Sequence, residues 1–519
     1  MLRTATLATV ALFALPAALA QAPKQGGTIR VAINSDIRST AVGISRDANT
    51  DGVMMHIVEG LVGYREDGTT APMLAESVAT SADGKTYTFK LRSNVKFHNG
   101  APMTSADAVA SLKKWLDPAT KWLCLADFDG SKGVKIESVE APDATTVVVK
   151  TSKAEALFLT NLAALHCGQT AVLHRDSWNP DGTMKMPIAT GPYKMGEWKR
   201  GEFIEIDAFR EYASKPGKVD GYAGAKMPHA DKVRWIVIKD DAAARAALVK
   251  GQIDILPGLS QSELADMGKP ADIVVKSATT MGVYGILIQT KDPVMSNPKL
   301  RKALAHALDL KPLAEIASGG VGVANASVVP VVSSYHSAAQ KKGYGFDPAK
   351  VKQLLAEAGY KGEPLKMLTN RRYPTMYDMA VMVQGMAKKA GINIELEVLD
   401  WPTQLDRYQK GNYQLSAFGY SARVDPAMSY EAMLGDKAKS PRKVWDNPQA
   451  IALYDEAMVV ADKARRQEIF DRMHAMMLED APMIVLFNPG DSNGMSRKVE
   501  GYQPWPLSRE RLFGVWRNN

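Results

Sequence analysis

The clearest local pattern in the chain is a strict alternation of apolar and polar residues that leads into a turn and a helix start. In TYTFKL, residues 86–91, every second residue is apolar, which predicts a strand with one buried face. His98-Asn99-Gly100 supplies turn-forming residues. Thr104-Ser105-Ala106-Asp107 then fits a capping box, so we expect a helix to begin there.

The second half of the chain alternates short apolar runs with amphipathic segments. The runs predict strands at Leu365–Leu368, Ile392–Leu399 and Tyr413–Phe418, and the segments predict helices at Met376–Lys389 and Thr403–Lys410. Strands that alternate with helices are typical of a mostly parallel sheet with right-handed crossovers. We therefore predict an α/β fold.

The first half shows the same alternation more sparsely. Thr28–Asn34 reads as a buried first strand, and a helix is expected over about residues 51–61. Val233–Ile238 and Ile253–Leu256 predict two further strands. Asp240-Asp241 is a helix cap between them, so this stretch predicts one β-α-β unit.

The N-terminus has the pattern of an export signal. Residues 1–20 combine Arg3, an apolar core and Ala18-Leu19-Ala20, which predicts a signal peptide cleaved after Ala20. No later stretch reaches the ~18 apolar residues of a spanning helix, so we expect a periplasmic protein. A chain of 519 residues with 46% apolar residues can bury more than one core, which predicts two or three domains.

Composition removes several classes of function. The net charge is +8, but the basic residues are scattered, which argues against nucleic-acid binding. The eight histidines lack ligand spacing and no CxxC occurs, so we predict no metal and no cofactor. Without a G-x-S-x-G elbow or other nucleophile–base spacing, we predict no enzyme. Cys124 and Cys167 form either a disulfide, which an exported protein permits, or two separate buried thiols.

Residues 86–109, TYTFKLRSNVKFHNGAPMTSADAV, resemble the signature YTFxLRxxVKFHDGxPxTAxDV of the family 5 extracellular solute-binding proteins. These proteins are the dipeptide, oligopeptide and nickel group of ABC importers, and here Asn99 replaces the aspartate of the signature. Thr190-Gly191-Pro192-Tyr193 resembles the family's GTGPY, and residues 301–309, RKALAHALD, resemble RQALxxAID. The resemblance extends through nearly the whole mature chain.

The resemblance implies a two-lobed periplasmic-binding-protein fold of type II, with an extra inserted subdomain and a ligand cleft between the lobes. It implies no catalysis. The expected division of the chain is a signal peptide at 1–20, an N-terminal lobe from 21–55, 187–283 and 489–519, an inserted subdomain at 56–186, and a second lobe at 284–488.

Topology predicts where a ligand binds. In open α/β sheets, ligands bind beyond the carboxyl ends of the strands. Three loops of the second lobe follow predicted strands and carry cations, aromatics and an acid, and two weaker candidates follow strands of the first lobe. The candidate ligand-binding residues are Arg423, Tyr420, Trp401, Asp425, Arg371, Arg372, Ser421, Tyr373, Ser35 and Leu259.

The resemblance also suggests roles for some of these residues. NRRY, residues 370–373, resembles the SRPY of the dipeptide binders, in which the arginine receives the ligand carboxylate, so Arg371 takes that role on this match. Asp425 lies where those proteins place an acid for the peptide ammonium. Arg423 adds a cation where they carry acid, which favours a carboxylate-bearing ligand over a peptide.

The sequence therefore predicts a periplasmic binding protein of an ABC importer, acting as a monomer that delivers its ligand to a membrane permease and ATPase complex. A periplasmic sensor or chaperone of the same fold, not coupled to import, is the alternative. Nickel is disfavoured because no histidine lies in the three loops. Short peptides, sugar acids, opines and aromatic acids remain open as ligands.

Overall fold

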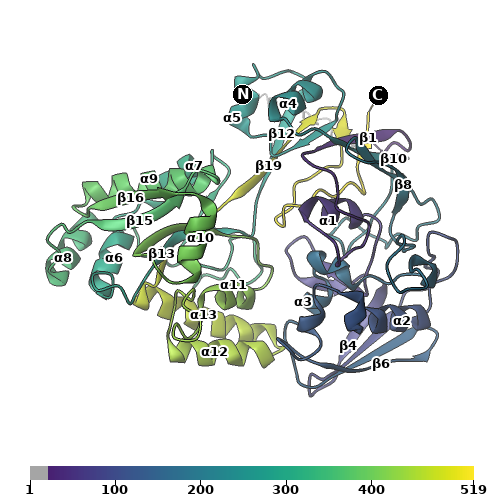
Figure 1. The fold of residues 1–519 in the computed structure, drawn as a ribbon, viewed down its shortest axis with the longest axis horizontal. Coiled ribbons are helices and arrows are strands. Elements are labelled where there is room, and N and C mark those ends of the chain that lie inside the picture. The colour runs from purple at the N-terminus through teal and green to yellow at the C-terminus, as the bar shows by residue number, and fades with distance from the viewer. Residues whose placement is uncertain (1–21, 519) are drawn as a thin grey trace, which may run out of the picture.

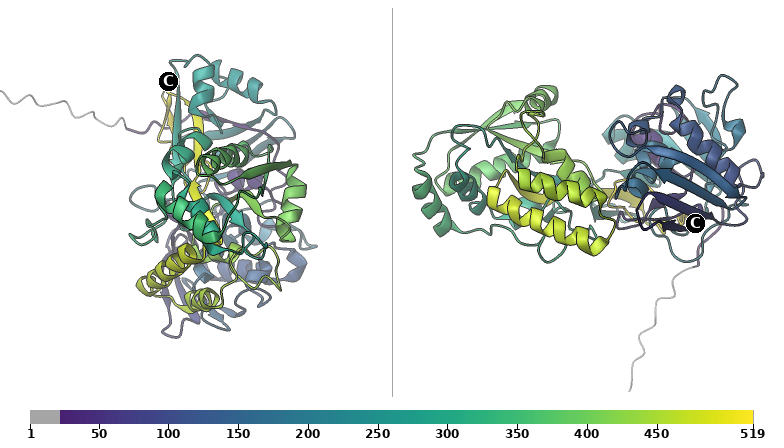
Figure 2. Two further views of the ribbon diagram at one scale, coloured as in Figure 1. Left: turned by 90° about the vertical axis from the view of Figure 1, so that its left-hand side faces the viewer. Right: turned by 90° about the horizontal axis from the view of Figure 1, so that it is seen from below.

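The computed structural model describes residues 22–518, which form two lobes joined by crossing segments (Figure 1). The view from below shows the lobes next to each other, with a thinner connection between them (Figure 2, right). Within the described residues no helix is long and apolar enough to cross a membrane. The predicted signal peptide and its cleavage after Ala20 lie outside the described residues.

The first lobe is built on a seven-stranded sheet of order β12-β19-β11-β1-β10-β9-β8. The central strand β1 pairs in parallel with both β10 and β11, so the expected β-α-β unit is present, with α4 (Asp241–Val249) as its connection. The strands are β1 Thr28–Ile33, β8 Tyr193–Lys199, β9 Phe203–Ala208, β10 Lys232–Val237, β11 Ile255–Pro257, β12 Ile273–Thr279 and β19 Gly490–Ser496. They come from three separated stretches of the chain, as the predicted discontinuous lobe requires; the exact limits of the lobes stay a prediction.

The insert carries the signature segment and packs directly on the first lobe. Its four-stranded sheet has the order β4-β5-β7-β6, and α2 (Ser105–Leu116) lies against it. Phe89 of β5 and Val31 of β1 belong to one hydrophobic core, so the insert shares its interior with the first lobe. The elements of the insert include β2 Val62–Tyr64, β3 Thr70–Pro72, β4 Ala75–Thr80, β5 Thr86–Leu91, β6 Ile136–Asp143, β7 Thr146–Thr151 and α3 Phe158–Leu162. Further elements of the first lobe are α1 Ala48–Met54, α5 Gln261–Asp266, β20 Val499–Glu500 and β21 Trp516–Arg517.

The predicted capping box at the start of α2 is confirmed. The backbone N–H and the hydroxyl of Thr104 both donate to the Asp107 carboxylate, at 2.8 and 2.7 Å. Leu112 and Trp115 of the helix are then buried at 3% and 0% exposure. The local pattern thus fixed both the start of the helix and its buried face.

The second lobe has a six-stranded sheet of order β14-β18-β13-β17-β15-β16. The strands are β13 Val283–Ile288, β14 Val323–Ala324, β15 Leu365–Asn370, β16 Ile394–Leu399, β17 Leu415–Tyr420 and β18 Met483–Asn488. The helices are α6 Pro298–His306, α7 Leu310–Ala317, α8 Pro348–Ala358, α9 Pro374–Lys389, α10 Trp401–Gln409, α11 Pro426–Met433, α12 Pro448–Val459 and α13 Lys463–Asp480. The expected strands and helices are present, with ends shifted by a few residues.

The prediction of a mostly parallel sheet was wrong for the second lobe. In the described part of the second lobe, the only parallel pairings are β15 with β16 and β15 with β17, and the pairings β13–β17, β13–β18 and β14–β18 are antiparallel. The cause is the connection between the lobes, because β13 enters the second sheet from the first lobe and β18 leaves it in the opposite direction. Two neighbouring strands that run in opposite directions pair antiparallel, even where strands and helices alternate along the chain.

The lobes are joined by two short crossings, at Thr280–Gly282 between β12 and β13 and at Pro489 between β18 and β19. The Thr280 N–H donates to the Pro489 carbonyl at 2.8 Å, which ties the two crossings together. A second contact lies on the far side, where the Ala156 N–H of the insert donates to the Met458 carbonyl of α12 at 2.8 Å. The lobes therefore enclose a space between these two contacts.

Two histidines of the first lobe and insert are buried in their neutral form. Nε2 of His98, in the signature turn, donates to the Gly191 carbonyl at 3.0 Å, and its Nδ1 accepts the Ala189 N–H. Nε2 of His56 accepts the Leu512 N–H at 3.0 Å. Burial lowers the pKa of each imidazole to about 4, because a second ring proton has no acceptor there.

This arrangement predicts a stability that falls as the pH is lowered from about 6.5 to about 4. The folded pKa of each histidine lies below its unfolded value, so the unfolded state binds more protons in that window. Each histidine then removes up to ~1.4 kcal/mol of unfolding free energy per pH unit. Urea unfolding across this pH range should give a shallower slope for His98→Gln than for the parent; equal slopes would contradict the assignment.

Candidate functional site

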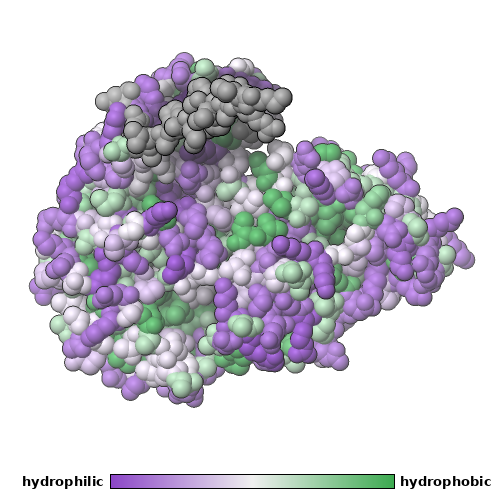
Figure 3. All heavy atoms as spheres, turned by 180° about the vertical axis from the view of Figure 1, so that it is seen from behind, coloured by the Kyte–Doolittle hydropathy of each residue, from purple (hydrophilic) through white to green (hydrophobic). Residues whose placement is uncertain are grey.

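A cavity of about 890 Å³ lies between the lobes, bounded by both lobes and by the crossings. Seen from behind, hydrophobic side chains gather in the middle of the molecule, where the lobes meet (Figure 3). The lining residues are Arg46, Asp51, Tyr64, Leu165, His166, Thr280, Gly282, Tyr284, Tyr373, Met376, Trp401, Gly419, Tyr420, Ser421, Ala422, Arg423, Val424, Met428, Pro489, Leu507, Ser508 and Arg509. A space of this size holds a small organic molecule.

The second lobe contributes an aromatic wall. The rings of Tyr373 and Trp401 meet edge to face, with centroids 5.0 Å apart. Trp401 and Tyr420 both contact Phe418, at 5.8 and 5.0 Å between centroids, so the wall is continuous. These side chains start at the carboxyl ends of β15, β16 and β17, which explains why loops far apart in sequence converge. Such a wall suits an apolar or planar part of a ligand.

The charges in the cavity are predominantly positive. Arg46 forms a two-pronged ion pair with Asp51, the one acid among the described residues that line the cavity. Arg423 donates to the Ser421 hydroxyl at 2.7 Å and Arg509 to the Ser508 carbonyl at 2.7 Å. Within residues 22–518 neither of these two guanidinium groups has an ion-pair partner. Two cations therefore remain available to an anionic ligand.

His166 adds a titratable group to the same cavity. The His166 side chain is exposed to solvent, and desolvation by the surrounding chain, followed by the charges of Arg46 and Arg423, lowers the pKa of its imidazole. Its neighbour Cys167 forms a disulfide with Cys124, with a Cα–Cα distance of 5.6 Å, so of the two alternatives for these cysteines the structure has the disulfide. The next turn holds Gln169 at φ 54°, a left-handed conformation that is uncommon outside glycine. The disulfide thus anchors the loop that carries His166.

Five of the ten candidate residues from the sequence lie together in this cavity. They come from all three loops that topology selected and include the cation expected to favour a carboxylate. They are Tyr373, Trp401, Tyr420, Ser421 and Arg423. Their role as ligand contacts stays a prediction.

Arg371 and Arg372 lie outside the cavity, although they belong to a selected loop. The Arg371 guanidinium packs 4.2 Å from the ring centroid of Tyr377 and donates to its hydroxyl at 2.9 Å. Arg372 lies 6.0 Å from the ring centroid of Tyr373. Both side chains are exposed. In this structure they cover aromatic rings at the surface and do not line the space between the lobes.

The Asp425 carboxylate forms a buried ion pair with Arg466. Its two carboxylate oxygens accept from Arg466, each at 2.8 Å, and both side chains are buried. Oδ1 also accepts the Ala427 N–H and so caps α11. The carboxylate therefore has structural partners and does not line the cavity.

The two first-lobe candidates also lie elsewhere. The Ser35 hydroxyl accepts from Asn49 at 2.8 Å, near the end of β1. Leu259 is 2% exposed and belongs to a small core beside α4 and α5. A Cβ built on Gly494 would lie 2.3 Å from Leu259, so that leucine fills the space a glycine leaves. Neither side chain is among those that line the cavity.

Sequence reasoning missed Arg46, His166 and Arg509. Arg46 and Arg509 lie in loops and His166 in a short 3-10 helix, Leu165–Thr170; none belongs to a motif, and they come from distant parts of the chain. The one local signal is Ser508, whose φ of 51° marks an unusual turn just before Arg509. A backbone angle cannot be read from the sequence, so the sequence did not indicate Arg509 as a site residue.

Comparisons with known proteins agree with this architecture. A sequence model described as "Bacterial extracellular solute-binding proteins, family 5 Middle" matches residues 69–441. Heme-binding protein A of Haemophilus influenzae is 26% identical over 501 residues, covering 91% of this chain and 88% of that protein. The structure of the ABC transporter substrate-binding protein CtaP from Listeria monocytogenes is 24% identical with a TM-score of 0.80, covering 96% and 100% of the two chains. The structure of AgaA from A. tumefaciens R10 in complex with agropinic acid is 26% identical with a TM-score of 0.67, covering 95% and 99%.

Proposed function

Because this chain belongs to the bacterial extracellular solute-binding proteins of family 5, we propose that it captures a carboxylate-bearing organic solute between its lobes for an ABC importer. The observation that carries the proposal is the pair of unpaired arginines, Arg423 and Arg509, in a cavity whose single acid is already neutralised. A planar guanidinium binds a carboxylate with two parallel hydrogen bonds. The aromatic wall of Tyr373, Trp401 and Tyr420 packs against the rest of the solute.

The arrangement also supports a closing motion. Arg423 is on the second lobe and Arg509 on the first, so a solute that contacts both favours the conformation in which the lobes approach. The short crossings at Thr280–Gly282 and Pro489 absorb the change in backbone angles. The closed form is then the one the permease recognises. The proposal involves no chemical step.

We place the mature protein in the periplasm, as a monomer released by cleavage after Ala20. Membership of an extracellular family and the export pattern of residues 1–20 support this location. The partner is an ABC permease and ATPase complex at the inner membrane. An uptake assay in cells that lack this protein separates an importer from a sensor of the same fold, because only the importer loses transport of the solute.

The proposal is tested by native mass spectrometry of protein purified without denaturation, followed by titration of the compound that is released. A carboxylate-bearing compound is expected. Its identity then provides the probe for binding experiments on variants. A released compound without an anionic group would contradict the proposal.

Replacing Arg423 with alanine should weaken binding of that compound by about 10- to 100-fold, since one charge-assisted hydrogen-bonding group is lost. Calorimetric titration measures the effect. Arg371→Ala is the matched control: it removes an exposed arginine from the neighbouring loop, and the affinity should stay within about twofold. If Arg371→Ala weakens binding and Arg423→Ala does not, the carboxylate binds at the loop that resembles the dipeptide binders.

A further inference from the structure

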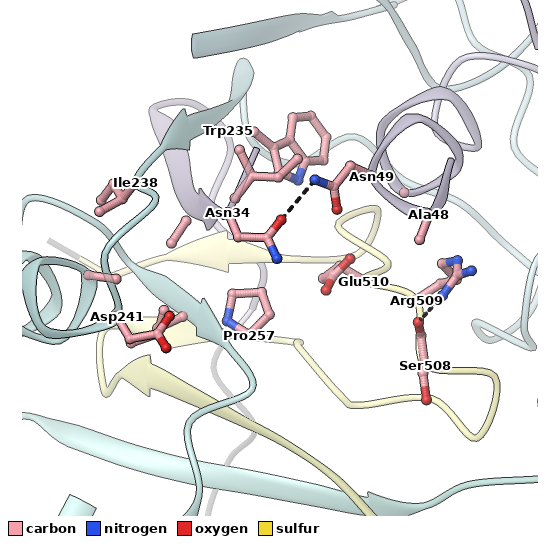
Figure 4. Close-up of a pocket in the computed structure, with 15 residues that line it drawn as sticks. Asn34, Ala48, Asn49, Trp235, Ile238, Asp241, Pro257, Ser508, Arg509 and Glu510 are labelled. Carbon is pink, nitrogen blue, oxygen red and sulfur yellow. Dashed lines mark hydrogen bonds between the residues drawn. The ribbon is translucent and has the colours of Figure 1, made fainter. Parts of the chain in front are cut away.

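A second, smaller pocket of about 260 Å³ opens next to the cavity, inside the first lobe. The two spaces share Ser508 and Arg509, so a molecule held at Arg509 can extend into both. Figure 4 shows Asn34 at the end of β1, Asn49 on α1, Trp235 on β10 and Glu510 arranged around this pocket. None of the ten residues proposed from the sequence lines it.

The two asparagines leave one free group each. Nδ2 of Asn49 donates to Oδ1 of Asn34 at 3.0 Å and also to the Ser35 hydroxyl and carbonyl. Within residues 22–518 no partner remains for Nδ2 of Asn34, a donor, or for Oδ1 of Asn49, an acceptor. The pair therefore presents one donor and one acceptor side by side.

Trp235 and Glu510 extend this mixed pattern. The Trp235 side chain is 2% exposed and lines the pocket, and within the described residues no hydrogen bond engages its Nε1–H. An indole N–H only donates, so an acceptor on a molecule in the pocket would pair with it. The Glu510 carboxyl has no ion-pair partner within residues 22–518. Burial raises its pKa, and the nearby charge of Asp491 does so as well.

The combination of free donors and acceptors selects among ligand groups. An ammonium group only donates, so it would pair with Asp241 and Glu510 but would leave the Trp235 and Asn34 donors unmatched. A carboxylate only accepts, so beyond Arg509 it would leave the free acceptor of Asn49 unmatched. A hydroxyl group both donates and accepts, so neighbouring hydroxyls match the whole set. The ring of Trp235 and the side chain of Pro257 supply apolar surface for the carbon–hydrogen faces between hydroxyls.

We propose that this pocket binds the hydroxyl groups of a polyol or sugar portion of the solute. The inference rests on the proposed function, since Arg509 is to hold the carboxylate at the boundary of the two spaces. The solute is then a hydroxylated acid, such as a sugar acid or a conjugate of a sugar with an acid. Peptides without hydroxyl groups would leave the free donors and acceptors of this pocket without hydrogen-bond partners.

The test compares D-gluconate with hexanoate, two six-carbon carboxylates that differ in their hydroxyl groups. Calorimetry on the full mature chain should show a preference for gluconate of about tenfold or more, the size expected for a few additional hydrogen bonds. In Asn34→Leu, which fills the pocket and removes a donor, this preference should disappear. Asn34 is exposed at the end of β1, and circular dichroism checks that the variant is folded.

A second variant, Asn34→Asp, keeps the size of the side chain and its bond from Asn49 but loses the donor, so it should also reduce the preference. Equal binding of gluconate and hexanoate by the parent, a preference that survives in both variants, or no response to gluconate at millimolar concentration would each overturn the inference. The proposed function fails separately, when the released compound has no anionic group or when its binding does not depend on Arg423. If the released compound is a carboxylate without hydroxyl groups, the inference of a polyol-binding pocket is contradicted, whereas the proposed function is not.

Discussion

Replacing Lys226 with methionine is expected to lower the free energy of unfolding by about 3–5 kcal/mol. Nζ of Lys226 lies 2.6 Å from Oε1 of Glu59, and both side chains are 1% exposed. Glu59 also accepts from the hydroxyls of Thr190 and Tyr212, each at 2.9 Å. Burial opposes the charge on Glu59, but the charge and hydrogen bond of Lys226 outweigh it and hold the pKa of Glu59 below its ordinary value. Without Lys226 a buried carboxylate loses its counter-charge.

Urea unfolding at neutral pH measures this effect. Lys199→Met is the matched control, because it breaks an ion pair with Glu202 in which the side chains are 57% and 58% exposed. That change should cost at most about 1 kcal/mol. A double variant, Lys226→Met with Glu59→Gln, should recover part of the loss, since the uncompensated charge is removed. Similar losses for Lys226→Met and Lys199→Met would show that the buried pair contributes no more than a surface pair.

This buried pair also explains part of the family signature. Thr190 belongs to the TGPY segment, and Gly191 of the same segment accepts the hydrogen bond from His98 of the signature turn. A Cβ on Gly191 would lie 2.4 Å from the Ile57 carbonyl, so the close approach of these chains requires glycine. The TGPY segment and the signature turn, which are distant in sequence, therefore contact each other in the fold. Their residues identify the fold, and Thr190, Gly191 and His98 are not among the residues that line the cavity.

The fold was largely predictable because its local signals are strong. The alternation at residues 86–91 and the pairing of Thr104 with Asp107 depend on neighbours within a few residues, and the structure has both. The direction of the crossing strands was not predictable in this way. It depends on where β13 and β18 enter the second sheet, which is a property of the whole chain path.

The candidate site was predictable only in the lobe where topology gives a rule. Trp401, Tyr420 and Arg423 lie at the carboxyl ends of strands of the second sheet. The rule that ligands bind at these ends selected them, and they line the cavity. Arg509 follows no strand, and its place depends on packing of the C-terminal segment. Asp425 was proposed as a ligand contact, but its carboxylate pairs with Arg466. Because Arg466 lies 41 positions away and no local pattern links the two residues, the sequence did not indicate this pairing.

That pair carries the second large effect: replacing Arg466 with methionine is expected to cost about 3–5 kcal/mol of unfolding free energy. The change leaves the Asp425 carboxylate buried without its two hydrogen bonds of 2.8 Å, and it also removes the bond to the Tyr335 hydroxyl at 3.0 Å. Asp425 ends the loop that carries Arg423, so solute affinity should fall as well. Denaturant unfolding and calorimetric titration measure the two effects on the same preparation.

The adjacent residue supplies the control for this variant. Arg465 is 45% exposed and pairs with Glu456 and Glu468 at the surface, so Arg465→Met should cost at most about 1 kcal/mol. Solute affinity should not change in that variant, because the loop and its anchor are intact. Asp425→Asn with Arg466→Met should be more stable than Arg466→Met alone, since an amide is cheaper to bury than a carboxylate. If instead Arg466→Met lowers stability and leaves affinity unaltered, the pair supports α11 and α13 without positioning Arg423.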